Sequence, residues 1–319
     1  MQNSTKANKT VIITGATSGL GYSCAEAIAR SGQDWQIIIA SRNLSKVEEA
    51  VRTLIAETKY PNIEGMSLDL ASTASVRQFV KNFLTGERPP LQAIVCNAGI
   101  SLVSDTLYTE DGFEMTFGVN HLGHFLLVNL LLPQMSDRSG IVFVSSSVHD
   151  PDANTGMPHP QYQAAKALAF PTDDDNNANI GNTGRERYTT SKLCNILCAY
   201  ELSRRLQKQQ SNITVNAFNP GLMLDTKFYR DCSESEMSAF VANVPQSIMD
   251  SARDSKTMGN ALARLILDPS LNGTTGKYFD GLEEVRSSDE SYDEKKATEL
   301  WESSAELLKL SPKEATLVQ

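Results

Sequence analysis

The stretch that decides the fold is Thr10-Val11-Ile12-Ile13-Thr14-Gly15-Ala16-Thr17-Ser18-Gly19-Leu20-Gly21. It begins with a run of β-branched residues, which are typical of a buried strand, and it leads into a helical pattern over residues 21–30. Between the two, three glycines follow the spacing G-x-x-x-G-x-G. Glycines let a backbone approach a pyrophosphate, and a helix N-terminus supplies N–H donors. The stretch therefore predicts a dinucleotide-binding turn; the alternative is a tight turn without a ligand.

The rhythm of short apolar runs and longer helical segments continues along the chain. Strands are expected at residues 10–13, 36–40, 64–70, 93–96, 141–145, 214–218 and 277–279. Helices are expected at 21–30, 44–57, 72–84, 110–135, 188–207 and 255–267. The strand runs are continuously apolar, which indicates burial on both faces. The sequence therefore predicts the α/β class, as a single doubly wound Rossmann-type domain with a mostly parallel seven-stranded sheet flanked by helices.

The expected domain covers residues 9–283, because no linker rich in Pro, Gly or Ser divides it. A polar tail, 1–8, precedes it, and an acidic helical extension, 284–319, follows. Two segments break the rhythm: an insertion loop at 150–187 and a substrate lid at 222–255. Each follows a strand, so both should rise from one edge of the sheet. The lid carries the apolar residues Met223, Leu224, Phe228 and Tyr229; the alternative for it is a permanently packed helical hairpin.

Composition excludes several classes of protein. The 319 residues carry a net charge of −9, which disfavours a nucleic-acid partner. No stretch approaches the ~20 apolar residues of a transmembrane segment, and the N-terminus lacks the apolar core of a signal peptide. Five cysteines, a low and odd number, fit a reduced setting, so we expect a cytoplasmic protein. We expect no metal site, because neither His121 with His124 nor Cys194 with Cys198 has completing ligands.

The residues after the second expected strand are Ser41-Arg42-Asn43. In dinucleotide-binding folds an acidic residue here accepts the ribose 2′-OH, whereas an arginine accommodates a 2′-phosphate. Arg42 stands here without an acid, so the sequence favours NADP(H) over NAD(H). The alternative is a solvated surface arginine.

A second motif, Tyr188-Thr189-Thr190-Ser191-Lys192, places a tyrosine and a lysine on one face of a helix. A free tyrosine has a pKa near 10, and a neighbouring ammonium lowers it. The pair can then give a proton to a carbonyl oxygen or take one from an alcohol. The fifth expected strand ends in Ser145-Ser146-Ser147, at the edge where ligands bind, so one of these hydroxyls can hold the substrate oxygen.

Together these residues resemble the short-chain dehydrogenase/reductase superfamily. The resemblance covers about residues 9–283 and runs in the family's order. Its motifs are Thr14-Gly15-x-x-x-Gly19-x-Gly21, Asp69-Leu70, Asn97-Ala98-Gly99, Val119-Asn120-His121, Ser145-Ser146, Tyr188-x-x-x-Lys192 and Pro220-Gly221. One departure is the connection of 42 residues from Ser146 to Tyr188, which is longer than in the common family pattern.

The resemblance implies a role for each motif. Asn120 would hold a proton-relay water, Ser146 would polarise the substrate, Tyr188 would be the acid/base, and Lys192 would also bind the nicotinamide ribose. By its position Ser146 is preferred to its two neighbours. Asp69 would contact the adenine. The implied cofactor-binding set is Thr14, Gly15, Ser18, Gly19, Leu20, Gly21, Ser41, Arg42, Asp69, Leu70, Asn97, Ala98, Gly99, Tyr188, Lys192, Pro220, Gly221 and Thr226.

Further motifs are similar to the branch that holds retinol dehydrogenases and light-dependent protochlorophyllide reductases. They are Phe113-Glu114-Met115, Asn120-His121-Leu122-Gly123-His124-Phe125, Ser147-Val148-His149 and the acidic tail with Trp301. Cys194 also resembles the protochlorophyllide enzyme, whereas Leu222 stands where that enzyme would have a cysteine.

The sequence thus predicts an NADP(H)-dependent oxidoreductase that transfers hydride between nicotinamide and a carbonyl or alcohol carbon of an apolar small molecule. One rival is a light-dependent C=C reductase of the protochlorophyllide type. A rival of another class is a catalytically silent NADP-binding sensor or scaffold, against which the intact Ser146, Tyr188 and Lys192 argue. The substrate, the preferred direction and the oligomeric state stay open.

Overall fold

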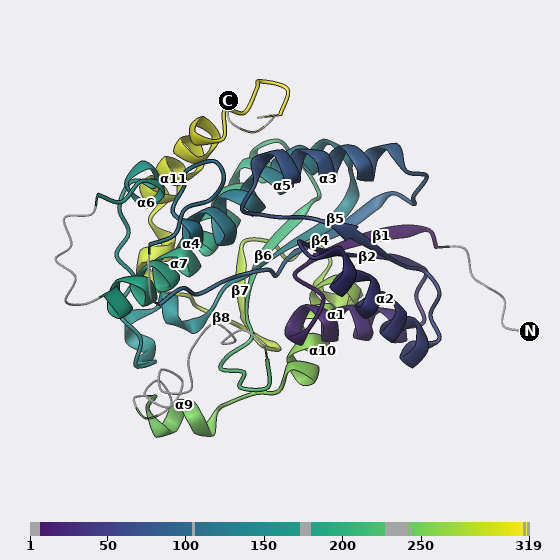
Figure 1. Ribbon diagram of the computed structural model, residues 1–319, viewed down its shortest axis with the longest axis horizontal. Coiled ribbons are helices and arrows are strands. Elements are labelled where there is room, and N and C mark those ends of the chain that lie inside the picture. Colours follow the sequence, from purple (N-terminus) through teal and green to yellow (C-terminus); the bar gives the residue numbers. More distant parts are fainter. Residues whose placement is uncertain are drawn as a thin grey trace, which may run out of the picture.

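The computed structural model describes residues 7–103, 106–172, 180–226, 242, 244–314 and 317. Its centre is one sheet with the strand order β3-β2-β1-β4-β5-β6-β7-β8 (Figure 1). The strands are β1 (Lys9–Thr14), β2 (Trp35–Ser41), β3 (Ile63–Ser67), β4 (Leu91–Cys96), β5 (Met135–Val144), β6 (Thr214–Asn219), β7 (Lys277–Asp280) and β8 (Glu283–Val285). All neighbours pair in parallel except β7 and β8. The predicted α/β fold with a mostly parallel sheet is confirmed.

The strand count differs from the expected seven. The eighth strand, β8, is antiparallel to β7, and each of its three residues is exposed. Because β8 is short and has no buried apolar run, the pattern that revealed the other strands is missing from it.

Helices cover both faces of the sheet (Figure 1). The longer ones are α1 (Gly19–Arg30), α2 (Leu44–Thr58), α3 (Thr73–Thr85), α5 (Gly123–Leu131), α7 (Ile180–Lys208), α10 (Ser255–Leu267) and α11 (Glu294–Leu307). Short helices are α4 (Met115–Phe117), α6 (Ala165–Ala169) and α9 (Gln246–Asp250). Successive strand residues point to opposite faces of the sheet and belong to two hydrophobic cores. Ile12 belongs to the core with α3, α5 and α7, whereas Ile13 belongs to the core with α1, α2 and α10. This alternation explains the continuously apolar strands.

The expected helix over residues 110–135 begins later and is not uniform. Gly112, with a φ of +84°, turns the chain, and the Glu114 carboxylate then caps the helix by accepting N–H bonds from Thr116 and Phe117. One π-helical turn, Gly118–Leu122, interrupts it before α5. Leu132–Gln134 closes it as a 3₁₀ turn, so β5 begins six residues earlier than expected.

The expected insertion loop at 150–187 is partly helical, which corrects that prediction. It contains α6, and α7 begins within it at Ile180 rather than at Tyr188. Gly184 lies inside this part of α7, where an added Cβ would come within 2.1 Å of the Leu102 carbonyl oxygen. Glycine is a weak helix former, so the sequence does not predict a helix here. The close contact with Leu102 nevertheless leaves room only for glycine at this position. In the expected lid at 222–255, Phe228 and Tyr229 lie outside the described residues.

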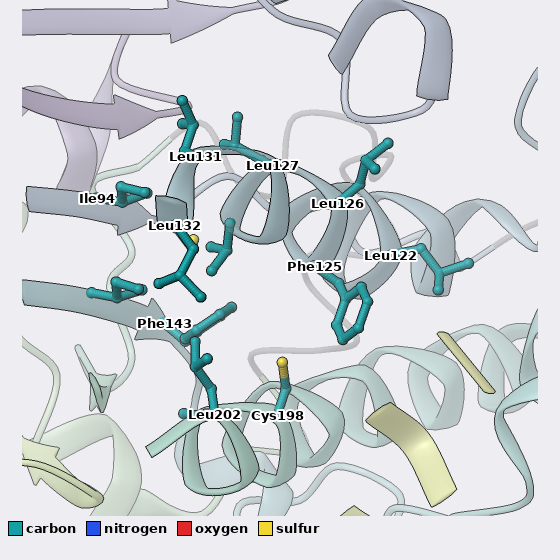
Figure 2. Packing of buried hydrophobic residues seen from close by; sticks show 14 of the residues in the cluster. Ile94, Leu122, Phe125, Leu126, Leu127, Leu131, Leu132, Phe143, Cys198 and Leu202 are labelled. Atoms are coloured by element: carbon teal, nitrogen blue, oxygen red, sulfur yellow. The ribbon is translucent and has the colours of Figure 1, made fainter. Parts of the chain in front are cut away.

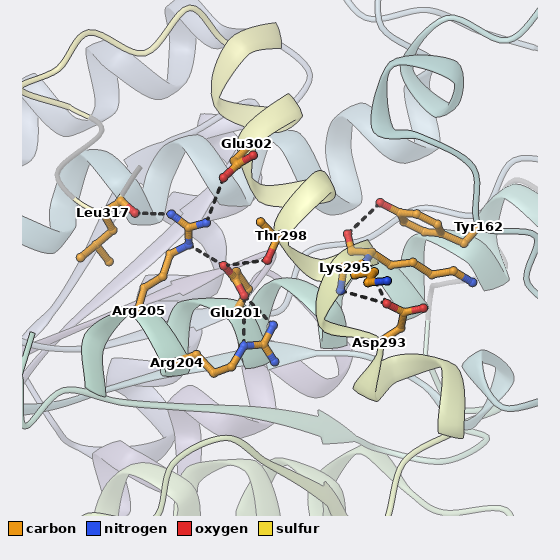
Figure 3. Close-up of polar contacts among 10 residues, drawn as sticks. Tyr162, Glu201, Arg204, Arg205, Asp293, Lys295, Thr298, Glu302 and Leu317 are labelled. Atoms are coloured by element: carbon orange, nitrogen blue, oxygen red, sulfur yellow. Dashed lines mark hydrogen bonds and ion pairs between the residues drawn. The ribbon is translucent and has the colours of Figure 1, made fainter. Parts of the chain in front are cut away.

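The acidic C-terminal segment packs against α7 (Figure 3). The Arg205 guanidinium on α7 binds Glu201 of the same helix and donates to the carbonyl oxygen of Leu317, at 2.6 Å each. It also stacks 5.4 Å from the Trp301 ring centroid on α11. Buried rings and the charged side chain of Arg205 therefore help to attach the segment to the core.

The stretch Met115–Gln134 is long and apolar enough to cross a membrane, with a mean hydropathy of 1.3. It is 89% buried inside the protein. Figure 2 shows Leu122, Leu126, Leu127 and Leu131 of this stretch among the core side chains. Although the sequence predicts no stretch of this length, the apolar side chains of this one are packed in the core.

Phe125 provides a test of this core, because its ring is 1% exposed and lies edge-on to Trp301 with centroids 4.7 Å apart. We expect Phe125→Ala to lower the free energy of unfolding by about 3–5 kcal/mol, since it leaves a cavity. Leu84→Ala, at a side chain that is 46% exposed, is the control and should change it by less than about 0.5 kcal/mol. Urea denaturation measures both; equal losses would contradict this packing.

Candidate active site

A cavity of about 850 Å³ opens at the carboxyl ends of the strands. Both irregular segments contribute to its wall, as expected for segments that leave one edge of the sheet: Met157 from the first and Met223 from the second. The predicted site residues that line the cavity are Thr14, Gly15, Ser18, Gly19, Leu20, Ser41, Arg42, Asp69, Leu70, Asn97, Ala98, Gly99, Ser146, Tyr188, Lys192, Pro220, Gly221 and Thr226. Gly21 and Asn120 do not line it.

The glycine turn after β1 is built by close backbone contacts. Gly15 has a φ of +68°, and an added Cβ would lie 2.8 Å from the Cα of Ala98. At Gly21 an added Cβ would lie 2.5 Å from Nδ2 of Asn97. Gly21 thus makes room for the Asn97 side chain, which donates to the Thr14 carbonyl oxygen at 2.8 Å. Gly21 is therefore needed in the motif for packing beneath the turn rather than for contact with the cavity.

The hydroxyl of Thr14 joins the ends of β1 and β4. Its oxygen accepts N–H bonds from Asn97 at 2.9 Å and from Ala98 at 3.0 Å. It also lies 2.8 Å from Nε2 of His124 on α5. One buried hydroxyl therefore holds three segments together at the floor of the cavity.

Arg42 follows β2 and is exposed at the rim. Within the described ranges its guanidinium has no hydrogen bond or ion pair with another side chain. The next residue, Asn43, caps α2 by accepting an N–H bond from Lys46. After the neighbouring strand β3, the Asp69 carboxylate accepts an N–H bond from Ala71 at 2.9 Å. Arg42 is thus a cation at the position where a 2′-phosphate is expected.

Tyr188 and Lys192 both reach the cavity from α7. Lys192 is 3% exposed, and its Nζ donates to the Val144 carbonyl oxygen at 3.1 Å. Nζ also lies 5.5 Å from the centroid of the Tyr188 ring. Burial lowers the pKa of Lys192 to about 8, so it carries an ammonium at neutral pH. A positive charge so close to the phenol favours its ionised form.

The three serines after β5 have different surroundings. The Ser145 hydroxyl is 2% exposed and donates to the Lys192 carbonyl oxygen at 2.7 Å, so it fastens β5 to α7. Ser146 is half-buried and its hydroxyl oxygen is 3.4 Å from the backbone N–H of Val148. The N–H of Ser147 binds the Asn219 side chain. These contacts favour Ser146 over Ser145 as the residue facing a ligand, and its catalytic role stays a prediction.

Asn120 lies in the π-helical turn and is fully buried. Its side-chain oxygen accepts from Ile100 N–H, and its amide donates to the Ile100 carbonyl oxygen and to the Ser191 hydroxyl, each at 2.9 Å. The side chain is therefore used for joining α7 to the end of β4. Its expected role in holding a relay water stays a prediction.

Comparisons with known proteins agree with this geometry. The family model described as short chain dehydrogenase matches residues 9–169. Retinol dehydrogenase 13 of Homo sapiens is 35% identical over 318 residues, covering 95% of this chain and 85% of that protein. The chain belongs to the short-chain dehydrogenase/reductase family. The chloroplastic protochlorophyllide reductase of Daucus carota is 33% identical over 321 residues, covering 94% of this chain and 78% of that protein.

These relatives place this short-chain dehydrogenase, an oxidoreductase, in the predicted branch of retinol dehydrogenases and protochlorophyllide reductases. A crystal structure from Mycobacterium paratuberculosis superposes with a TM-score of 0.65 at 28% identity, covering 96% of this chain and 95% of that one. A blue fluorescent protein from a metagenomic library, solved in complex with NADPH, has a TM-score of 0.61 at 21% identity and covers 86% of this chain and 98% of that one. The second likeness shows the shared fold.

Among the polar residues of this dehydrogenase's cavity that were not anticipated from its sequence are Asn219, Arg253 and Asp280. The Asn219 side chain accepts N–H bonds from Ser147 and Gly221 and donates to Asp280, so it ties together the ends of β5, β6 and β7. Arg253 forms an ion pair with Asp280 at 2.6 Å, and its N–H donates to the Leu222 carbonyl oxygen. Asn219 directly precedes Pro220-Gly221, which was an available signal; the Arg253–Asp280 pair has no local signal.

His121 and His124 are both buried on this helical stretch, but they contact different elements. His121 binds the Ser304 hydroxyl on α11 through Nε2, whereas His124 reaches Thr14. Burial lowers the pKa of His121 to about 3 and that of His124 to about 4, so both are neutral in the folded protein near neutral pH. Over the described ranges no three metal-ligating side chains converge.

These histidines predict acid sensitivity. As the pH falls below about 6.5, each histidine of the unfolded chain gains a proton that the folded protein does not take up until its lower pKa, so stability is lost between pH 6.5 and 4. From pH 7.5 to pH 5.0 each should cost about 2 kcal/mol. We expect His121→Phe to reduce the pH dependence of unfolding by that amount in urea titrations at both pH values. An unchanged dependence would contradict the assignment.

Proposed function

We propose that this chain is an NADP(H)-dependent oxidoreductase that transfers hydride between C4 of the nicotinamide and a carbonyl or alcohol carbon of an apolar small molecule. The observation that carries the proposal is the buried Lys192 ammonium, 5.5 Å from the Tyr188 ring, in the cavity that the glycine turn also lines. A proton-transfer group and a dinucleotide-binding turn thus share one space.

The residues of the cavity fit the cofactor. Gly15, with a φ of +68°, packs its backbone closely against Ala98 and lines the cavity, and the start of α1 lies beside it. The Arg42 guanidinium, which has no partner side chain among the described residues, would supply the charge for a 2′-phosphate. Asp69 would face the adenine, and Pro220, Gly221 and Thr226 would lie beside the nicotinamide. When bound, the nicotinamide supplies or accepts the hydride.

The chain's own residues then move the proton. In the reductive direction the Tyr188 hydroxyl donates its proton to the substrate oxygen, which the Ser146 hydroxyl holds. The phenolate left behind is stabilised by the Lys192 ammonium, and the oxidative direction reverses these steps. A structural role alone would not require a lysine to be desolvated beside a tyrosine at a ligand cavity.

The walls of the cavity support an apolar substrate. Fifteen of the lining side chains are apolar and are not part of the cofactor set. They are Ala40, Leu68, Ile100, Leu102, Leu107, Met115, Val119, Val144, Val148, Ala153, Met157, Leu222, Met223, Val244 and Ile248. Burial of apolar substrate surface against such a wall contributes roughly 25 cal/mol per Å² of area removed from water.

A second candidate function is the light-dependent reduction of a C=C bond, favoured by the 33% identity to the protochlorophyllide reductase. Cys194 is one of the residues by which the sequence resembles that enzyme. It is fully buried and does not line the cavity. A screen of aldehydes, ketones and alcohols in the dark, in which turnover is measured by nicotinamide absorbance, distinguishes the two candidate functions. Dark turnover supports the carbonyl/alcohol proposal, and turnover only under illumination would replace it.

Cofactor choice has its own test. We expect Arg42→Ala to weaken NADPH binding by about one to two decades, because a charge-assisted hydrogen bond contributes roughly 1.5–3 kcal/mol. NADH binding should stay nearly unchanged. Arg52→Ala, another exposed arginine that does not line the cavity, is the matched control. Fluorescence titration measures both cofactors; equal losses of NADPH and NADH would argue against a phosphate contact.

The acid/base role predicts a separation of binding from turnover. Tyr188→Phe removes only a hydroxyl, so NADPH affinity should survive while kcat falls by about 10²–10⁴. Steady-state kinetics with a substrate from the screen, together with cofactor titration, measure the two effects. A variant that turns over at the wild-type rate would remove Tyr188 from this role.

A further inference from the structure

His124 occupies a position that neither the hydride nor the proton step uses directly. It is fully buried on α5, one turn beyond Asn120. Its Nδ1 lies 3.1 Å from the carbonyl oxygen of Asn120, and its Nε2 lies 2.8 Å from the hydroxyl oxygen of Thr14. The ring therefore joins the π-helical turn to the residue that begins the glycine turn.

The chemistry of these partners determines where the protons are. A carbonyl oxygen can only accept, so Nδ1 of His124 carries the hydrogen and donates it to Asn120. The neutral ring then has an acceptor at Nε2, which lies 2.8 Å from the Thr14 hydroxyl oxygen. The other acceptor within reach of this hydroxyl, the Val95 carbonyl oxygen, is farther away at 3.3 Å. The Thr14 oxygen keeps its lone pairs for the N–H groups of Asn97 and Ala98. The two ring nitrogens of His124, the Thr14 hydroxyl and the Asn120 carbonyl oxygen all have partners only when His124 is neutral. This agrees with the lowering of the His124 pKa by burial.

Asn120 continues this network toward the proton-transfer group. Its amide donates to the Ser191 hydroxyl at 2.9 Å, and that hydroxyl donates to the Tyr188 carbonyl oxygen at 2.7 Å. A chain of buried contacts thus runs from the glycine turn, through His124 and Asn120, to the helical turn that carries Tyr188.

We propose that His124 is a positioning residue: through the Thr14 hydroxyl and the Asn120 carbonyl it fixes the cofactor turn relative to the Tyr188 turn of α7. Hydride and proton must reach the two ends of one C–O bond, and small misplacements of reacting groups cost rate steeply. This inference rests on the proposed function, because it gives His124 the role of holding the cofactor-binding turn and the proton-transfer residue Tyr188 in the correct relative positions.

His121 provides a matched control on the same stretch. It is equally buried and also has a depressed pKa, but its Nε2 binds Ser304 of α11 at 2.8 Å, away from the cofactor turn. Its ring packs between Phe117 and Phe125. His121→Phe therefore removes a buried histidine and one hydrogen bond without touching the Thr14 contacts.

The experiment measures NADPH affinity by fluorescence, kcat at saturating NADPH, and the free energy of unfolding. We expect His124→Phe to weaken NADPH roughly three- to tenfold, the equivalent of one net hydrogen bond, and to lower kcat as well. Thr14→Val should weaken NADPH at least as much, because it also removes the acceptor of the Asn97 and Ala98 N–H groups. The double variant should bind NADPH no more weakly than Thr14→Val, because His124→Phe removes a contact that Thr14→Val has already removed. Thr14→Ser, which keeps the hydroxyl, should restore affinity, and His121→Phe should lose stability with affinity and kcat unchanged.

The outcomes separate the two proposals. If the wild-type protein does not bind NADPH, the proposed function fails. If it binds NADPH but His124→Phe matches His121→Phe in affinity and kcat, or if the two single effects add in the double variant, the positioning role is overturned. Should His124→Phe fail to fold, His124→Asn tests the same point. It keeps an N–H for the Asn120 carbonyl and loses the reach to Thr14, so wild-type affinity in that variant would also overturn the proposal.

Discussion

The parallel pairing of β1 with both β2 and β4 is the constraint on which the rest of the structure depends. The chain winds in one direction from β1 to β3 and in the other from β4 onward. The connections leave in opposite directions at this point, so a crevice opens beyond the carboxyl ends of the strands. Every strand from β1 to β7 points its carboxyl end to the same edge, so the polar residues after the strands gather there.

Buried polar contacts then set the shape of that edge. The Thr14 hydroxyl connects β1, β4 and α5, and the Asn219 side chain connects β5, β6 and β7. Both side chains are 3% exposed or less, so each unpaired group would carry the full cost of desolvation. Such fully used groups hold the strand ends in one arrangement, and a preorganised cavity loses less freedom when a ligand binds.

Desolvation also makes the proposed chemistry possible. Lys192 has its ammonium in the interior with one carbonyl partner, and burial lowers its pKa to about 8. In such surroundings its charge acts on Tyr188 through a low local dielectric, which strengthens the effect on the phenol.

The sequence by itself determined those parts of the fold and site that local patterns encode. The strand–glycine–helix unit, the spacing of Tyr188 and Lys192 and the Arg42 position were all readable, because each joins residues close along the chain. Tertiary structure alone decided that α7 begins at its Ile180 end, that Asn120 is turned inward and that His124 meets Thr14, 110 residues away. The reason is physical: periodicity reports which face of an element is buried, whereas the partner of a buried polar group is chosen by how the elements pack.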